Sequence, residues 1–149
     1  MKVRIPDLGE EPRGLDFTEL VPGVPGQSFE RHLKVRAEIY KSGRDVHLSG
    51  HIAGRVLSSC PRCLDEFSSG LDRDFRFLLM PREARAYDGA DEGVDCYSGD
   101  ELDLSPLVQE QALLALDGSV LCSGACKGLC PEGGTNLNHK ACSCDRREA

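Results

Sequence analysis

Apolar and polar residues alternate along two neighbouring stretches in the first half of the chain. Every second residue is apolar over residues 33–39, and the same period of two runs over residues 46–56. This alternation is typical of β-strands that have one buried face. The residues between the two stretches, 41–45, are polar and include a glycine, so they suit a turn. The pattern therefore predicts an antiparallel hairpin that delivers the chain to Cys60.

The next stretches carry weaker signals. Gly50 and Gly54 lie inside the second predicted strand, where a residue without a side chain suggests a bulge or a bend. Residues 74–80 read as a third strand, and Pro81 should end it because proline has no amide hydrogen for a ladder. Residues 82–93 are charged and lack an apolar period, so we expect a mobile surface loop.

A helix is predicted directly after Leu104. Ser105 can cap it, Pro106 suits its first turn, and Gly118 suits a left-handed stop at its end. Its apolar residues form a broad stripe that should pack on the sheet: Leu107, Val108, Ala112, Leu114, Ala115 and Leu116. The chain is thus expected to have an α+β fold, a twisted antiparallel β-sheet with one main helix.

The apolar pattern ends near residue 121. Over residues 122–144 the only large aliphatic side chains are Leu129 and Leu137, too few to offset the entropy cost of ordering the segment. We therefore expect residues 1–121 to form the sheet-and-helix core. Residues 122–149 should form a cysteine-rich metal-binding tail packed on that core, a zinc knuckle with a frayed end at residues 145–149.

Seven of the eight cysteines stand in clusters, which is why a metal is expected. One cluster pairs Cys60 with Cys63, and the other gathers the cysteines of the tail: Cys122, Cys126, Cys130, Cys142 and Cys144. Thiolates two or three residues apart can converge on one ion, and tetrahedral zinc is their usual partner. The chain opens Met1-Lys2-Val3-Arg4-Ile5, without the apolar segment of a secreted, disulfide-bonded domain. A reducing, cytoplasmic setting is therefore predicted.

A thiol-dependent redox protein is the alternative explanation of the same cysteines. A redox pair would need a helix N-terminus to lower the pKa of its nucleophile, whereas Asp65 and Glu66 follow Cys63 and would raise that pKa. Cys96 lies in a strand-like stretch and reads as a small, semi-buried apolar residue. We can assign no Ser/His/Asp set, phosphate-binding glycine loop or pair of catalytic carboxylates, so we expect no enzyme activity.

Charge and aromatic content limit the classes of partner. The formal net charge is −7, which argues against a surface that binds phosphate as a whole, and the absence of Trp leaves little for stacking on RNA bases. The best local concentration of basic residues, and hence the candidate RNA or partner contact, surrounds the tail cysteines: Lys127, Lys140, Arg146 and Arg147. No apolar run approaches the roughly 20 residues needed to cross a membrane, so no membrane partner is expected.

Several motifs follow one another in an order that resembles a known family. They are Cys60-Pro61-Arg62-Cys63-Leu64, Leu102-Asp103-Leu104 before the helix, Cys126-Lys127-Gly128-Leu129-Cys130-Pro131, Thr135-Asn136-Leu137-Asn138 and Cys142-Ser143-Cys144. This order resembles the YceD family from about Leu33 onward. Proteins of that family are described as supporting accumulation of the large-subunit ribosomal RNA in bacteria and plastids.

The resemblance implies a non-enzymatic accessory factor in the synthesis, processing or stability of large-subunit (23S) ribosomal RNA during ribosome assembly. Because the chain is acidic, contact through a ribosomal protein or an rRNA-processing factor is favoured over direct capture of RNA, which the local basic patch would have to carry. A zinc-stabilised interaction module unrelated to RNA is a further alternative.

The chain departs from the family pattern at Gly133. The pattern continues Cys-Pro-x-Cys-Gly, so a cysteine is expected where Gly133 stands. If two four-ligand sites are implied, the more secure one consists of Cys60, Cys63, Cys122 and Cys126. The second would hold Cys130, Cys142, Cys144 and a replacement ligand, with His139 the nearest candidate and Cys96 a distant one. Loss of the second site, leaving reduced thiols, is the third reading.

Overall fold

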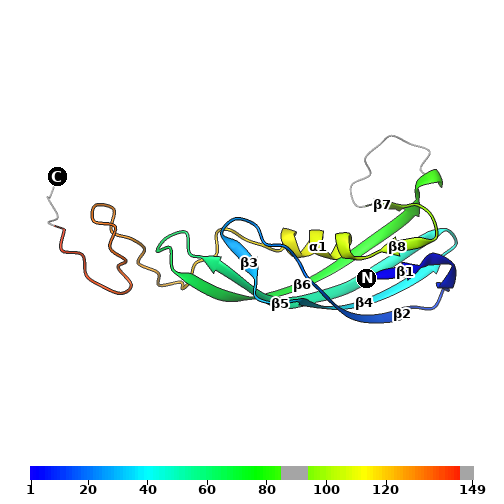
Figure 1. The fold of residues 1–149 in the computed structure, drawn as a ribbon, viewed down its shortest axis with the longest axis horizontal. Coiled ribbons are helices and arrows are strands. Elements are labelled where there is room, and N and C mark those ends of the chain that lie inside the picture. Colours follow the sequence, from blue (N-terminus) through cyan, green and yellow to red (C-terminus); the bar gives the residue numbers. More distant parts are fainter. Residues whose placement is uncertain (85–93, 145–149) are drawn as a thin grey trace.

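The structure, a computed structural model, describes residues 1–84 and 94–144. The chain is mostly β-sheet with one α-helix in the described part, and it is elongated (Figure 1). The elements are β1 (Lys2–Arg4), β2 (Arg13–Glu19), β3 (Gln27–Phe29), β4 (Leu33–Ser42), β5 (Asp45–Ser59), β6 (Glu66–Pro81), β7 (Val94–Tyr97), β8 (Glu101–Asp103) and α1 (Ser105–Leu114), with short 3-10 helices at Ile5–Asp7 and Arg82–Ala84.

The main sheet has the strand order β2-β4-β5-β6-β7, and β3 pairs with β5 beside this path. The predicted hairpin is confirmed as β4 and β5, which are antiparallel and joined at Gly43, whose φ is 62°. The third predicted strand is confirmed but is longer, because β6 already begins at Glu66 and pairs with β5 along its length. One prediction is wrong: the sheet is not wholly antiparallel, since β7 runs parallel to β6.

Gly50 and Gly54 serve the packing of the sheet. The register of β5 with β4 and β6 runs through both glycines without interruption, so a bulge is wrong for these described strands. A Cβ on Gly50 would lie 2.5 Å from the carbonyl oxygen of Arg36 and 2.7 Å from Cζ of Phe75. A Cβ on Gly54 would overlap the side chain of Leu33. The glycines therefore make room for large neighbours on the buried face.

The helix begins at the predicted place. Ser105 is the first helical residue and does not cap the helix, because Leu104 stands at the N-cap without a side-chain hydrogen bond; Asp103 Oδ1, one residue earlier, accepts a hydrogen bond from Ser105 N at 3.0 Å. The helix ends at Leu114 and is followed by Ala115 in a right-handed conformation, so the left-handed stop predicted at Gly118 is wrong. Leu114, expected in the apolar stripe, is 60% exposed.

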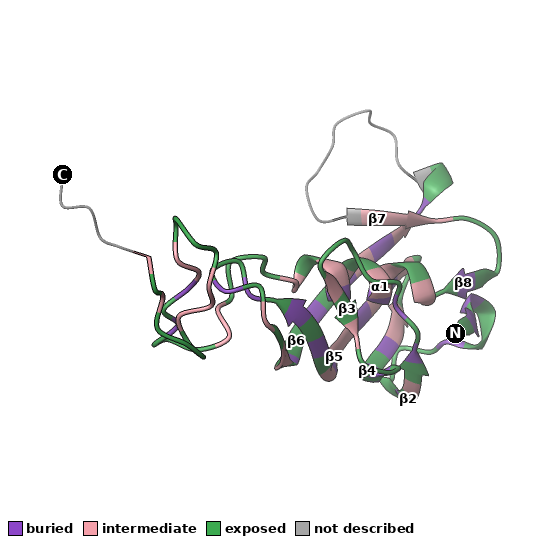
Figure 2. Ribbon diagram, turned by 60° about the vertical axis from the view of Figure 1, so that its left-hand side comes forward, coloured by how far each residue is buried: buried purple, intermediate pink, exposed green. Residues whose placement is uncertain are grey.

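The core lies between one face of the sheet and α1 (Figure 2). Its most deeply buried members come from β4, β5, β6, the helix and the residue that precedes the helix: Leu33, Val35, Ile39, Val46, Leu48, Ile52, Leu79, Val108, Ala112 and Leu104. Glu19, at the end of β2, accepts hydrogen bonds from Ser105 Oγ at 2.9 Å and Gln109 Nε2 at 2.8 Å. These bonds tie the helix to the edge strand.

The cysteine-rich segment, residues 122–144, extends beyond the end of the sheet where β5 turns into β6 (orange to red in Figure 1). The predicted loop over residues 82–93 lies outside the described residues except for residues 82–84, and the predicted frayed end, residues 145–149 with Arg146 and Arg147, lies wholly outside them. None of the helices in the described part of the chain combines the length and apolar character that crossing a bilayer requires.

Candidate metal centre

Four cysteines from two distant parts of the chain meet at the end of the sheet. Cys60 follows β5 and Cys63 lies in the turn to β6, whereas Cys122 and Cys126 follow α1. Their sulfur atoms all lie within 4.8 Å of one another, which defines the first cluster. The Sγ–Sγ distance is 3.8 Å for Cys60–Cys126 and 3.5 Å for Cys63–Cys122. A zinc ion bound by four thiolates at about 2.3 Å requires sulfur separations of about 3.8 Å, so this donor set fits zinc.

The first cluster is largely buried, so negative charge on its sulfur atoms requires hydrogen-bond donors or a cation nearby. Cys60, Cys63 and Cys126 are 0%, 2% and 4% exposed. Backbone N–H groups, led by that of Cys122, lower the pKa of the Cys60 thiol to about 6, while burial raises the pKa of Cys63 to about 12. Neighbouring thiols therefore resist joint ionisation, and a divalent cation among them would supply the missing positive charge.

The turn that carries Cys60 and Cys63 is a compact loop, here named the first knuckle (residues 60–65). Leu64 N donates to Cys60 O at 2.9 Å, and Cys60 N donates to Asp65 O at 2.9 Å. Leu64 has a φ of 64°, which makes it the one non-glycine residue with positive φ in the described chain. An L-residue in this conformation is strained, so the fold holds Leu64 there against its preference.

Polar side chains brace the first cluster from outside. Asp65 Oδ2 accepts hydrogen bonds from Asn136 Nδ2 at 2.9 Å and Cys63 Sγ at 3.5 Å, and His139 Nε2 lies 2.9 Å from the same oxygen. The bond from Asn136, and then that with His139, lowers the pKa of the Asp65 carboxyl. Asn138 Nδ2 donates to Cys126 Sγ at 3.5 Å. The motif that contains both asparagines thus fastens the segment to the first cluster.

A second cluster lies farther along the segment and consists of Cys130, Cys142 and Cys144, whose sulfur atoms are also within 4.8 Å of one another. The Sγ–Sγ distance is 3.9 Å for Cys130–Cys144 and 2.9 Å for Cys142–Cys144. The structure does not bring His139, the nearest candidate for the replacement ligand, to this cluster. The turn after Asn136, which is itself bonded to Asp65, aims the imidazole at the first knuckle instead.

The other predicted site residues lie apart from the sulfur atoms. Lys127 and Lys140 line a cavity of about 530 Å³ beside the second cluster, and Cys96 lies in β7, outside both clusters. Sequence reasoning missed the bracing roles of Asp65, Asn136 and Asn138. The sequence did contain a signal for these roles, because all three are hydrogen-bonding side chains in the motifs that also carry or flank the cysteines.

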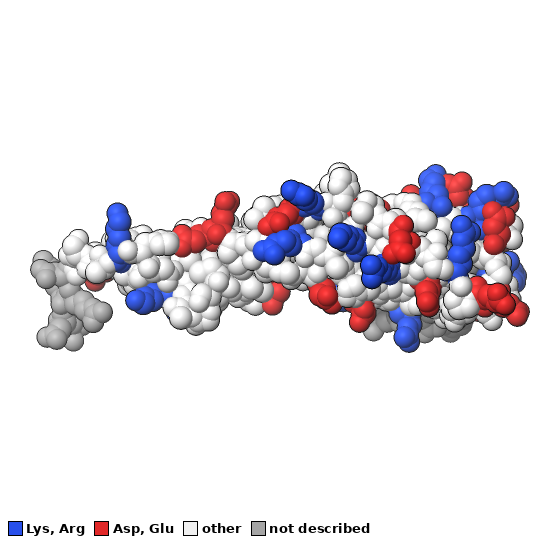
Figure 3. Space-filling view, turned by 90° about the horizontal axis from the view of Figure 1, so that it is seen from below, with Lys and Arg blue, Asp and Glu red and all other residues white. Residues whose placement is uncertain are grey.

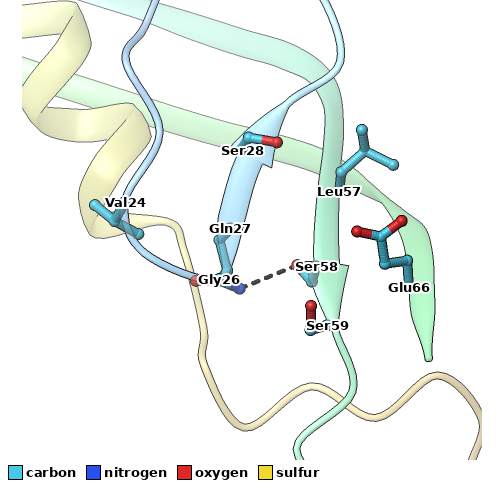
Figure 4. Close-up of a pocket in the computed structure, with 8 residues that line it drawn as sticks. All are labelled: Val24, Gly26, Gln27, Ser28, Leu57, Ser58, Ser59 and Glu66. Atoms are coloured by element: carbon cyan, nitrogen blue, oxygen red, sulfur yellow. Dashed lines mark hydrogen bonds between the residues drawn. The ribbon is translucent and has the colours of Figure 1, made fainter. Parts of the chain in front are cut away.

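A separate pocket of about 250 Å³ lies between the β3 loop and the ends of β5 and β6 (Figure 4). Its lining carries hydroxyl groups, and Gln27 Nε2 donates to Ser58 Oγ at 3.1 Å. Glu66 is the one carboxylate that lines it. Among the described residues of this lining, no hydroxyl or thiol lies against a base, so the pocket does not present a nucleophile ready for catalysis.

Comparison with known proteins gives this architecture a family. The family model described as "Large ribosomal RNA subunit accumulation protein YceD" matches residues 48–149. The chain belongs to the YceD family. The region of the YceD match runs from β5 to the C-terminal residue and contains all eight cysteines, so both clusters lie inside it.

One curated relative of this YceD-family chain is the "Large ribosomal RNA subunit accumulation protein YCED homolog 1, chloroplastic" of Arabidopsis thaliana. It is 23% identical over an alignment that covers 91% of this chain and 50% of the relative. The chain thus spans half the length of this relative. No solved structure gives a significant match to the chain.

Proposed function

We propose that this protein is a non-enzymatic accessory factor that supports accumulation of the large-subunit ribosomal RNA, and that zinc bound by Cys60, Cys63, Cys122 and Cys126 holds its cysteine-rich segment in place. The observation that carries the proposal is the first cluster itself, four converging sulfurs in a member of the YceD family. A bound ion would supply the cross-link that the small apolar content of the segment cannot.

Burial argues against the redox alternative at the first knuckle. A thiol that attacks a disulfide substrate must be reachable, and its sulfur must approach the substrate sulfur in line. Cys60 and Cys63 are 0% and 2% exposed, and their nearest sulfur neighbours are Cys126 and Cys122. This arrangement suits a closed structural site better than an exchange reaction.

The charge distribution supports contact through a protein more than through bare RNA. Basic and acidic side chains are interspersed over the face seen in Figure 3. Several charged side chains of the protein form pairs, such as Arg36–Asp16 and Arg55–Glu30, each with an N–O distance of 3.4 Å. A phosphate backbone favours an extended basic surface. We therefore propose a basic ribosomal protein or an rRNA-processing factor as the partner. Direct RNA contact would be confined to the local basic residues Lys127, Lys140, Arg146 and Arg147.

Metal content tests the first part of the proposal. Protein purified without added zinc should contain at least about one zinc ion per chain, and Cys63→Ser should remove the ion of the first cluster, whereas Cys96→Ser, a change outside both clusters, should not. A wild-type protein that is folded, reduced and free of metal would contradict the proposed zinc site.

The cellular role has a separate test. The protein should co-sediment with precursors of the large ribosomal subunit, and its loss should lower the amount of mature large ribosomal RNA. Changing Lys127, Lys140, Arg146 and Arg147 to Glu should abolish any direct RNA binding but leave the co-sedimentation intact if a protein partner carries it. Normal levels of large ribosomal RNA in cells without the protein would contradict the role.

A further inference from the structure

The segment contains a second knuckle, residues 130–135, with the backbone of the first. Gly134 N donates to Cys130 O at 2.9 Å, and Cys130 N donates to Thr135 O at 2.8 Å, the same two bonds that close residues 60–65. Gly134 has a φ of 64°, the value found at the matching position of the first knuckle. Gly133 therefore occupies the place that Cys63 has in the first knuckle, which is the place of a sulfur donor.

The space at Gly133 is directed at the second cluster. A Cβ built on Gly133 would lie 2.5 Å from Cys144 Sγ and 3.1 Å from Cys142 Sγ, and Gly133 N donates to Cys130 Sγ at 3.4 Å. Among the described residues, no fourth Cys, His, Asp or Glu joins the three sulfur atoms. Cys144 Sγ thus lies against the point from which the side chain of a fourth donor would start, and the second cluster faces Gly133 with no donor there.

The second cluster is also reachable from outside. The cavity of about 530 Å³ beside it is lined by Cys130, Cys142 and Cys144 together with Lys127 and Lys140. Three thiolates around a divalent cation leave a net negative charge, which the two lysines offset in part. A small ligand can therefore enter where the first cluster, closed by its own four sulfurs, admits none.

We propose that the second cluster binds a zinc ion through the thiolates of Cys130, Cys142 and Cys144 and leaves a fourth position open at Gly133, where a thiolate from outside the chain binds. This inference rests on the proposed metal binding of the protein and adds an exchangeable site to it. A thiolate is the donor that completes a tetrahedral sulfur site, and the entering thiol releases its proton to solvent. Cys142 and Cys144 must separate by about 0.9 Å (3.8 − 2.9) to reach the spacing of such a site.

Cobalt(II) provides the probe, because its absorption reports the number of sulfur ligands around it. The full chain, kept reduced with a phosphine, is titrated with cobalt(II). A variant that carries Cys130→Ser, Cys142→Ser and Cys144→Ser gives the spectrum of the first cluster alone. The difference between the two proteins isolates the second cluster, so failure of the first site, which would contradict the proposed function, is seen separately.

Glutathione is then added as a thiol of known structure. We expect a saturable change of the difference spectrum toward four sulfur ligands, and a mass increase of one glutathione per protein in native mass spectrometry. If the difference spectrum has four-sulfur character before glutathione is added and strengthens with protein concentration, the thiolate comes from a second copy. That result supports the open position as well.

Gly133→Cys and Gly133→Ala form a matched pair of variants, since both add a Cβ that requires Cys144 Sγ to shift, and only Gly133→Cys adds a donor. Gly133→Cys should bind metal at the second cluster on the order of tenfold or more tightly and lose the response to glutathione. Gly133→Ala should gain no affinity. The inference is overturned if the second cluster of the wild-type protein binds no metal, or if its spectrum does not change with glutathione or protein concentration. An equal response of wild type and Gly133→Cys would overturn it too.

Discussion

The sheet region, residues 2–116, and the cysteine-rich segment are organised in opposite ways. The sheet region has a continuous apolar core in which long strands and one helix bury their large aliphatic side chains. The segment has neither helix nor extended strand over its described residues, only an isolated bridge between Leu129 and Asn136. Its contribution to the cluster at the end of the sheet consists of Cys122 and Cys126.

The difference shows that the two regions depend on different sources of stability. Burial of apolar surface contributes roughly 25 cal/mol per Å², which the sheet region can exploit and the segment cannot. The segment instead has hydrogen bonds to Asp65 and sulfur atoms in position for cross-linking. Changes that remove metal should therefore destabilise the cysteine-rich segment, and changes that disturb packing should destabilise the sheet region.

The largest expected effect comes from Cys126→Ser. Structural zinc contributes an apparent binding free energy of roughly 10–16 kcal/mol in small metal-dependent folds, far more than the segment can gain by burial. We expect loss of zinc from the first cluster and loss of amide protection over residues 122–144, with the protection of β4, β5 and β6 retained. Hydrogen exchange read by mass spectrometry measures both regions at once.

Cys96→Ser serves as the control for this experiment, because Cys96 belongs to neither cluster. If Cys126→Ser left the protection of the segment unchanged, the contrast between the two regions would fail.

A packing change should show the reverse pattern. In Gly50→Ala the new methyl group would meet the carbonyl oxygen of Arg36 at 2.5 Å and the Phe75 ring at 2.7 Å, so we expect the free energy of unfolding to fall by about 1–3 kcal/mol. Gly70→Ala, in β6 with open space around the new Cβ, should stay within about 0.5 kcal/mol of wild type. Chemical denaturation measures both, and zinc content should be the same in both variants.

A smaller effect is expected at the boundary between the regions. Leu64 has a φ of 64°, so Leu64→Gly removes backbone strain of about 1–2 kcal/mol. The leucine side chain is 64% exposed, so its removal loses little buried apolar surface. Glycine also gives the unfolded chain more conformational freedom, which costs about 0.4–1 kcal/mol, so the net stabilisation is about 0.8 kcal/mol at the midpoints and at most about 1.6 kcal/mol. Amide exchange of the first knuckle should slow. Faster exchange would show that the leucine side chain stabilises the loop.

The smallest effect concerns the open face of the sheet. His51 lies 2.8 Å from Asp74 and 3.4 Å from Asp72, and the hydrogen bond with Asp74 raises the pKa of the imidazole above its usual 6.5. The protonated pair therefore stabilises the fold below about pH 6.5, and this contribution disappears as the pH rises through the raised value. Because the carboxylates are largely exposed, we expect only a few tenths of a kcal/mol.

Thermal unfolding of wild type and Asp74→Asn at about pH 6 and about pH 8.5 measures this contribution. The difference between the two proteins should be present at the lower pH and vanish at the higher one, and zinc content should not change. A difference that grows with pH would have the wrong sign for this pair.

The sequence predicted the elements whose patterning is local. The hairpin of β4 and β5 has clean alternation because one face is buried, and α1 follows a recognisable start signal. The first half of β6 was missed because its residues from Glu66 to Gly70 are mostly polar, and their strand conformation depends on pairing with β5. The parallel β7 was placed by tertiary pairing that no short stretch encodes.

For the site, spacing alone grouped the cysteines, because thiols within a few residues of each other have few ways to converge. The orientation of His139 could not be predicted from the spacing of residues in the sequence. It depends on a turn fixed by hydrogen bonds to Asp65, a residue more than 70 positions away in the chain.

The first cluster also imposes an order on folding. Its sulfur pairs join residues 66 and 59 positions apart, and the loop between them includes β6 and α1. Closing so long a loop in an unfolded chain has a high entropy cost, which a folded sheet and helix have already met by bringing the ends together. Under the proposed zinc binding, high-affinity metal uptake would therefore follow formation of the sheet, and a filled cluster would mark a chain whose core is complete.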